Sequence, residues 1–177
     1  LITKTIKMKK IYPLIIFVLS VKLVFTQSLT INSDKSIIEF NYVSEGAVGT
    51  INGVTGKINF DLSNLSNTSF EANANIKSIN TSNKTRDKHL NAPDYFDTEK
   101  YPAISFKSDS ITNSEDEFTL YGKFTIKDIT KEEKISFTFE ENIFNGRCVI
   151  FSNDYKIKTQ KKREDSKILI KISVPII

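Results

Sequence analysis

Apolar and polar residues alternate through most of the chain, and this pattern predicts β-strands. A period of two is clear in eight segments: residues 38–42, 58–62, 70–76, 104–106, 118–126, 135–139, 147–152 and 168–176. Turn-forming Gly, Asn, Asp and Ser residues separate them. Alternation buries one face of each strand, as in an antiparallel sheet. Because closure removes exposed edges most completely, we predict an all-β fold, a single closed antiparallel β-barrel of about eight strands.

One stretch, residues 84–98, interrupts the strand pattern and reads as a short helical insert. Its first half is one polar turn, which Pro93 would end because proline disfavours a helical conformation in the residue before it. Asp94 could then cap a second short turn that carries Tyr95 and Phe96. We expect this aromatic insert to lie as a plug or lid at the mouth of the barrel.

The N-terminal segment has the pattern of a secretory signal. The only methionine, Met8, is the expected start, and lysines lead from it into an apolar run, residues 11–25. That run is short and interrupted for a membrane span, which needs roughly 20 apolar residues. We expect cleavage before Gln27, with residues 1–26 as leader and residues 27–177 as one domain in the periplasm or outside the cell. A lysine inside the run leaves an uncleaved anchor open as an alternative.

The charge balance argues against nucleic acid as a partner. The chain has 25 basic and 21 acidic residues, but five of the basic and none of the acidic ones precede Gln27. The remaining domain therefore has 20 basic and 21 acidic residues, whereas nucleic-acid binding needs a concentrated basic footprint. The basic residues 161–163 are followed at once by Glu164 and Asp165, so we interpret them as a solvated hairpin end.

Residues suited to catalysis or metal binding are few. One cysteine, Cys148, and one histidine, His89, do not make a metal-ligand set. Cys148 lies in a strand-like run and is expected to be a small, half-buried apolar residue. A hydrolase using Asp94 and Asp97, with Glu99 nearby, is an alternative, although helix capping and solvation explain these carboxylates more simply. We therefore predict neither an enzyme, a metal site nor a resident cofactor.

Several spaced segments resemble the YceI-like family. The run HL-x-x-x-D-Y-F-D-x-x-x-Y-P-x-I-x-F-x-S occupies residues 89–108, and shorter matches lie at residues 54–61, 79–81 and 120–126. The resemblance extends over residues 36–176. It implies a lipocalin-like, periplasmic β-barrel that binds a polyisoprenoid.

The resemblance is incomplete near the C-terminus. There the family usually has an Arg, followed by an Asp, an aromatic residue and a Gly. Residues 151–157 of this chain keep Asp154 and Tyr155 but lack that Arg and that Gly. If that Arg steadies a ligand head group or a loop in the family, its loss here bears on which ligand is bound and leaves the barrel unaffected.

A long apolar lipid, such as a polyprenyl chain or the tail of an isoprenoid quinone, is the ligand that the resemblance implies. An eight-stranded barrel is either filled by side chains or just wide enough for one small ligand. The absent side chain of Gly122 would leave room for a ligand or for a packed phenylalanine. Arg86 and His89 could lie near a lipid head group, or be solvated. The candidate ligand-binding residues are Phe40, Phe60, Ile76, His89, Leu90, Tyr95, Phe96, Tyr101, Ile104, Phe106, Leu120, Gly122, Phe124 and Phe137.

Partners other than this lipid stay open at the level of sequence. Transient contact with a membrane would serve lipid exchange, and both a monomer and a homodimer are compatible with the chain. A filled barrel that binds a protein through its loops is the alternative to a lipid carrier.

Overall fold

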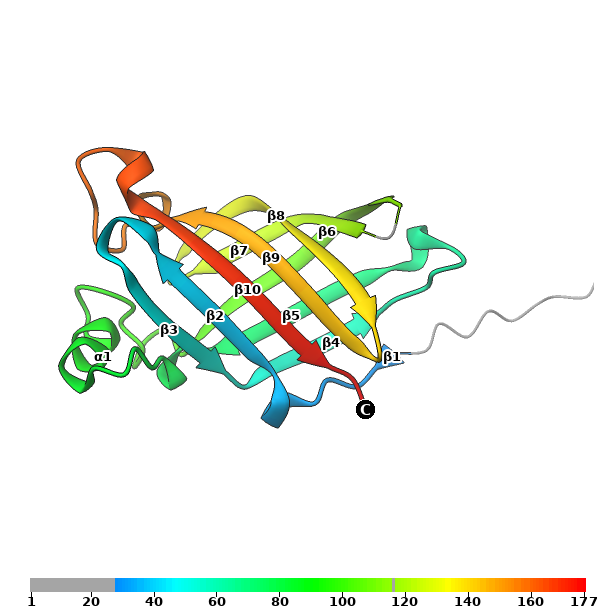
Figure 1. The fold of residues 1–177 in the computed structure, drawn as a ribbon, viewed down its shortest axis with the longest axis horizontal. Coiled ribbons are helices and arrows are strands. Elements are labelled where there is room, and N and C mark those ends of the chain that lie inside the picture. The colour runs from blue at the N-terminus through cyan, green and yellow to red at the C-terminus, as the bar shows by residue number, and fades with distance from the viewer. Residues whose placement is uncertain (1–27, 116) are drawn as a thin grey trace, which may run out of the picture.

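The computed structural model describes residues 28–115 and 117–177, which form one antiparallel sheet of ten strands (Figure 1). Along the sheet the order is β1-β4-β5-β6-β7-β8-β9-β10-β2-β3, and the sheet curls through 264°. The strands are β1 (Ser28–Leu29), β2 (Ile37–Tyr42), β3 (Ala47–Asn52), β4 (Val54–Asn59), β5 (Ser69–Asn75), β6 (Ala103–Ser114), β7 (Glu117–Ile126), β8 (Ile129–Glu140), β9 (Ile143–Phe151) and β10 (Lys167–Pro175).

The predicted all-β, antiparallel architecture is confirmed, and the strand number and the closure differ from the prediction. Ten strands replace about eight, and the order of the described strands begins at β1 and ends at β3 without a ladder between these two edges. The predicted signal segment lies outside the described residues. Among the described residues, no helix has the length and apolar character needed to cross a bilayer.

The open seam beside β3 is covered by a short 3₁₀ segment, Ile76–Ser78, and the residues that follow it. Thr50 and Asn80 exchange two backbone hydrogen bonds of 2.9 Å each. The backbone N–H of Asn52 donates to Ser78 Oγ at 2.8 Å. The edge of β3 is therefore hydrogen-bonded although no further strand continues the sheet.

β3 is one of the two strands that the alternation pattern did not predict. Gly49 interrupts its alternation, and its position opposite Phe40 explains why. A Cβ atom at Gly49 would lie 2.5 Å from Phe40 Cζ and 2.6 Å from the backbone oxygen of Asn80. The missing side chain thus gives room to the ring of Phe40 and to the seam.

A cluster of phenylalanine rings fills one end of the curled sheet. Its rings lie 4.3–6.1 Å apart between centroids, mostly edge to face, which is the favourable geometry for aromatic pairs. We call this the closed end, and it lies at the right of Figure 1. The cluster consists of Phe60, Phe70, Phe118, Phe137, Phe139 and Phe144.

The opposite end carries the predicted insert, with a helix α1 at Lys84–Asn91 (Figure 1). The side chain of Asn83 caps α1 by accepting from the backbone N–H of Arg86 at 3.0 Å. The carboxylate of Asp87 accepts from the backbone N–H and the hydroxyl of Thr81, at 2.8 and 2.6 Å. The helix ends before Pro93, as predicted, and the residues after it form hydrogen-bonded turns.

Candidate functional site

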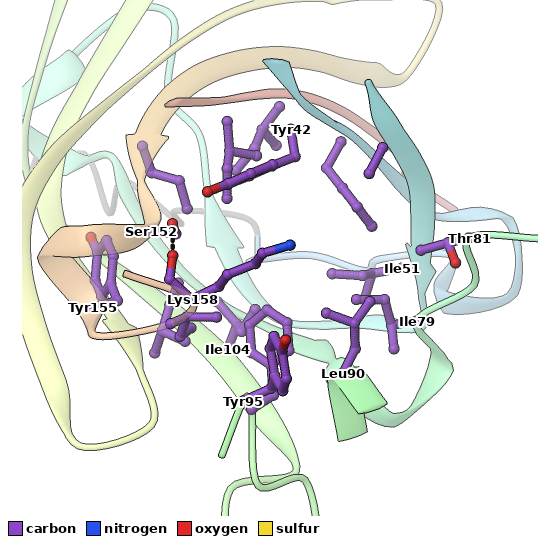
Figure 2. Close-up of a pocket in the computed structure, with 18 of the residues that line it drawn as sticks. Tyr42, Ile51, Ile79, Thr81, Leu90, Tyr95, Ile104, Ser152, Tyr155 and Lys158 are labelled. Carbon is purple, nitrogen blue, oxygen red and sulfur yellow. Dashed lines mark hydrogen bonds between the residues drawn. The ribbon is translucent and has the colours of Figure 1, made fainter. Parts of the chain in front are cut away.

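A cavity of about 430 Å³ lies inside the curled sheet, at the end covered by α1 (Figure 2). Its walls are mostly isoleucine side chains from the inward faces of the strands, together with aromatic side chains of the insert. The apolar lining residues are Ile38, Phe40, Tyr42, Ala47, Ile51, Ala74, Ile79, Leu90, Tyr95, Phe96, Ile104, Phe124, Ile126, Ile150, Tyr155, Ile157, Ile168, Ile170 and Ile172.

A second hollow of about 110 Å³ continues the cavity toward the closed end. The two spaces share five lining residues, so they adjoin. The shared residues are Ile38, Ala74, Ile104, Phe124 and Ile172. The phenylalanine cluster supplies the floor, because Phe70, Phe137 and Phe144 also line the second hollow.

Polar side chains gather at the mouth of the cavity. Lys158 Nζ donates to the carboxylate of Glu45, and Gln160 Nε2 donates to Tyr42 Oη at 3.0 Å and to Glu45 Oε1 at 3.2 Å. Figure 2 shows the Lys158 side chain extending across the opening between Tyr42 and Tyr95. This network joins the β2–β3 connection to the β9–β10 connection above an apolar interior.

Two basic side chains of the insert also line the cavity, those of Arg86 and His89. Both are exposed, and Arg86 forms no ion pair with any of the described residues. They could contact a polar group at the mouth while an apolar chain lies below them.

Tyr155 is the most deeply buried aromatic residue of the lining, with no exposed surface. Its hydroxyl donates to Glu133 Oε1 at 3.0 Å. Burial raises the pKa of the Glu133 carboxyl, although the hydrogen bond from Tyr155 acts in the opposite direction. Burial, followed by the nearby Glu133 charge, also raises the pKa of Tyr155, so its hydroxyl stays protonated.

The segment that departs from the family pattern, residues 151–157, has a left-handed residue and a paired aspartate. Lys156 adopts a left-handed conformation with φ of 53°, which glycine normally favours. Arg163 comes from later in the chain and pairs with Asp154 through Nη2 at 2.6 Å and Nε at 3.0 Å. A lysine therefore takes the left-handed conformation at this point, and the arginine that pairs with Asp154 comes from outside residues 151–157.

The structure brings ten of the fourteen predicted ligand-binding residues to the two spaces. Seven line the larger cavity: Phe40, His89, Leu90, Tyr95, Phe96, Ile104 and Phe124. Three more line the second hollow: Phe106, Leu120 and Phe137. The other four lie elsewhere: Phe60 is in the phenylalanine cluster, Ile76 is buried at the seam, Tyr101 lies under the Lys100 ammonium, and Gly122 is in β7.

The structure explains the glycine at position 122 differently from the two explanations that the sequence suggested. A Cβ atom there would lie 2.2 Å from the backbone oxygen of Lys107 and 2.7 Å from the Cα of Ser108. The register between β6 and β7 shifts at this point, between Ser108 and Ser110. The missing side chain accommodates the backbone of the adjacent strand at a β-bulge, and neither a ligand nor a phenylalanine occupies the space.

Several lining residues were absent from the predicted set. The alternation in β10 already placed Ile168, Ile170 and Ile172 on one face, so this part of the lining could have been found from the sequence. Ile157 and Lys158 lie in a loop without periodicity, and their positions gave no signal.

The residues considered for catalysis do not gather at the cavity. Asp94, Asp97 and Glu99 are absent from its lining, and Glu99 pairs with Lys77 at 2.8 Å. Cys148 is buried outside it, and burial raises the pKa of its thiol to about 12. The described residues contain no group of three or more His, Cys, Asp or Glu side chains placed to hold a metal ion.

A curled antiparallel sheet around an apolar cavity, closed by aromatic residues at one end and covered by a short helical insert at the other, defines the class of fold. The model of the YceI-like domain matches residues 29–176. The chain therefore belongs to the YceI-like family, as its sequence motifs suggested.

Relatives and solved structures agree with this assignment. Protein YceI of Escherichia coli O157:H7 is 34% identical over 83 residues, which cover 47% of this chain and 44% of that protein. Less than half of that relative is therefore matched. Burkholderia cenocepacia BcnA superposes with a TM-score of 0.73 at 19% identity, covering 81% of this chain and 98% of that one. A polyisoprenoid-binding domain from Saccharophagus degradans gives 0.57 at 9% identity, covering 82% and 95%. At these identities the structures show a shared fold.

Proposed function

We propose that this protein is an exported, non-enzymatic carrier that holds a long isoprenoid-type lipid, such as a polyprenyl chain or a quinone tail, inside the curled sheet. The observation that carries the proposal is the 430 Å³ cavity, which has apolar walls and a polar mouth. The polyisoprenoid-binding domain from Saccharophagus degradans, which shares the fold, supports the choice of lipid.

The size of the cavity sets how much of the lipid it can hold. A 150 Å³ protein cavity accommodates benzene, which gives a scale of about 25 Å³ per carbon atom. On this scale the larger cavity holds roughly 17 carbon atoms, and both spaces together roughly 22, or about four isoprene units. A longer chain would leave its remaining units at the mouth.

The chemistry of the walls suits an isoprenoid better than a polar ligand. Burial of each CH₂ contributes about 0.8 kcal/mol before the costs of binding, and a branched chain can fill spaces between isoleucine side chains. A head group would meet Arg86, His89 and the Glu45–Lys158 pair at the mouth. These residues would orient the lipid with its polar end outward.

The test is to titrate isoprenoid alcohols of increasing length, geraniol, farnesol and geranylgeraniol, and then a longer polyprenol. We expect affinity to rise strongly up to geranylgeraniol and then to level off, because further units lie outside the cavity. An unbranched n-alkanol with the same number of carbon atoms as farnesol serves as the control that isolates the effect of the methyl branches on affinity. Equal, weak binding at every length would refute the proposal, since a filled or inaccessible interior gives no length dependence.

A further inference from the structure

The charges of the β9–β10 connection are concentrated at the mouth of the cavity. This connection, residues 152–166, contains five basic and three acidic side chains. Lys158 pairs with Glu45, and Arg163 with Asp154. The exposed side chains that form no ion pair with any described residue include Lys156, Lys161 and Lys162.

The turns at the closed end have the opposite charge. The β6–β7 and β8–β9 turns lie at the right of Figure 1, away from the β9–β10 connection. Their acidic side chains include Glu115, Glu117, Glu140 and Glu141, of which Glu117 pairs with Arg147 at 2.5 Å. The unpaired lysines of the β9–β10 connection and these acidic turns therefore lie at opposite ends of the domain.

Exposed apolar side chains adjoin the same basic segment. Val43, in the β2–β3 connection, is 47% exposed, and the hydroxyl of its neighbour Ser44 donates to the backbone oxygen of Asp165 at 2.6 Å. This bond holds the tip of the β2–β3 connection against the basic loop. Val43 is thus an exposed apolar residue next to the contact with the basic loop and two residues from Glu45, which lines the cavity.

Three further exposed apolar side chains lie in a row on the outer face of four neighbouring strands. Val48 pairs with Asn41, Asn41 with Leu169, and Leu169 with Val149. The three apolar members of this row are 59, 40 and 41% exposed, in that order. Their chain neighbours Ala47, Ile168 and Ile150 line the cavity, so the row lies directly behind the wall of the mouth.

We propose that the mouth end docks onto the surface of an anionic phospholipid bilayer. The lysines of residues 156–162 would lie against the lipid phosphates, and Val43 with the apolar row would enter the interface. The acidic closed end would be repelled, so the charges orient the mouth toward the membrane. This inference rests on the proposed function for its purpose, because docking places the cavity mouth where an isoprenoid can be exchanged.

The test measures partition of the protein onto sedimented vesicles of phosphatidylcholine alone and of phosphatidylcholine mixed with phosphatidylglycerol. We expect binding to the mixed vesicles, and weaker binding as salt is added. The variant K161Q/K162Q should bind roughly 25-fold more weakly, at about fivefold for each lysine near an anionic surface. The control K35Q/K57Q removes the same charge from exposed lysines outside the mouth and should bind like the wild type.

Three outcomes would overturn the docking proposal. The first is equal binding to both kinds of vesicle, and the second is equal weakening of the two double variants. The third is a stable dimer that Val48→Ser and Leu169→Ser convert to a monomer, which would assign the apolar row to a second copy of the chain.

A farnesol titration without vesicles separates this proposal from the proposed function. Farnesol binding without vesicle binding would overturn the docking surface and leave the carrier intact. Vesicle binding that depends on Lys161 and Lys162, without farnesol binding, would support the docking surface and refute the carrier.

Discussion

Filling the cavity from one wall should remove a calculable part of its affinity for lipid. Ala74 lies between the two spaces, is buried, and lines both of them. On the scale of about 25 Å³ per carbon atom a phenyl ring needs about 150 Å³, so Ala74→Phe would leave about 390 Å³ of the two spaces together. The remaining room would suit roughly 16 carbon atoms, so about four of the 20 carbon atoms of geranylgeraniol would be displaced.

The expected loss follows from that displacement. At about 0.8 kcal/mol for each buried carbon, four displaced carbons correspond to about 3 kcal/mol, or roughly a hundredfold weaker binding. Titration calorimetry with geranylgeraniol measures the difference, and urea unfolding checks that the variant is folded. Ala103→Phe makes the same substitution at an exposed position of β6 and should bind like the wild type. Unchanged affinity in a folded Ala74→Phe variant would show that geranylgeraniol does not occupy this cavity.

Three further predictions concern stability and are measured by urea unfolding. Burial raises the pKa of Glu133 in the folded protein above its ordinary value of 4.5. The wild type therefore has its full stability below pH 4.5 and loses part of it as the pH rises through the raised pKa, because the buried carboxyl then ionises. Glu133→Gln cannot ionise, so its stability relative to the wild type should increase over that range and stay increased at higher pH. A constant difference across pH would contradict this. Lys156→Gly should stabilise the folded protein by up to about 1 kcal/mol, because the energy that a non-glycine residue loses in the left-handed conformation exceeds the entropy cost of glycine. A clear destabilisation would show that Lys156 is not strained. Gly122→Ala should cost at least about 2 kcal/mol, because its Cβ would overlap the backbone of β6, and a neutral effect would show that the bulge can relax.

The alternation of apolar residues predicted most of the sheet because it reports directly which face of a strand is buried. It placed Ile168, Ile170 and Ile172 on the face that now lines the cavity. It missed β3, where Gly49 replaces the apolar residue that alternation needs, since the ring of Phe40 occupies that space. Closure was also beyond the pattern, because a period of two identifies strands and says nothing about whether the two outer strands meet.

The candidate site was predictable where it lies on strands or in the aromatic insert, and unpredictable in the β9–β10 connection. There, the course of the backbone depends on left-handed residues at Lys156 and Lys158, for which lysine gives no sequence signal. Asp154 pairs with Arg163, nine residues further on, and no spacing in the sequence indicated that pair. Contacts of this kind follow from the tertiary fold.

The uneven charge distribution was hidden by the counts of basic and acidic residues. Residues 161–163 are exposed, as expected for a solvated hairpin end, and Lys161 and Lys162 form no ion pair within the described part of the chain. The balancing acidic residues lie in turns at the closed end, such as Glu140 and Glu141. Each long strand connects the two ends of the molecule, so charges that are close in the sequence can lie at opposite ends, and a count over the whole sequence does not show this.

The most direct test of the carrier is mass spectrometry of an organic extract from the protein, purified without detergent from its native host. The account predicts one isoprenoid-type lipid in near-stoichiometric amount from the wild type and from Ala103→Phe, and a strongly reduced amount from Ala74→Phe. An extract without any long-chain lipid, from a folded protein that farnesol does not bind, would contradict the account.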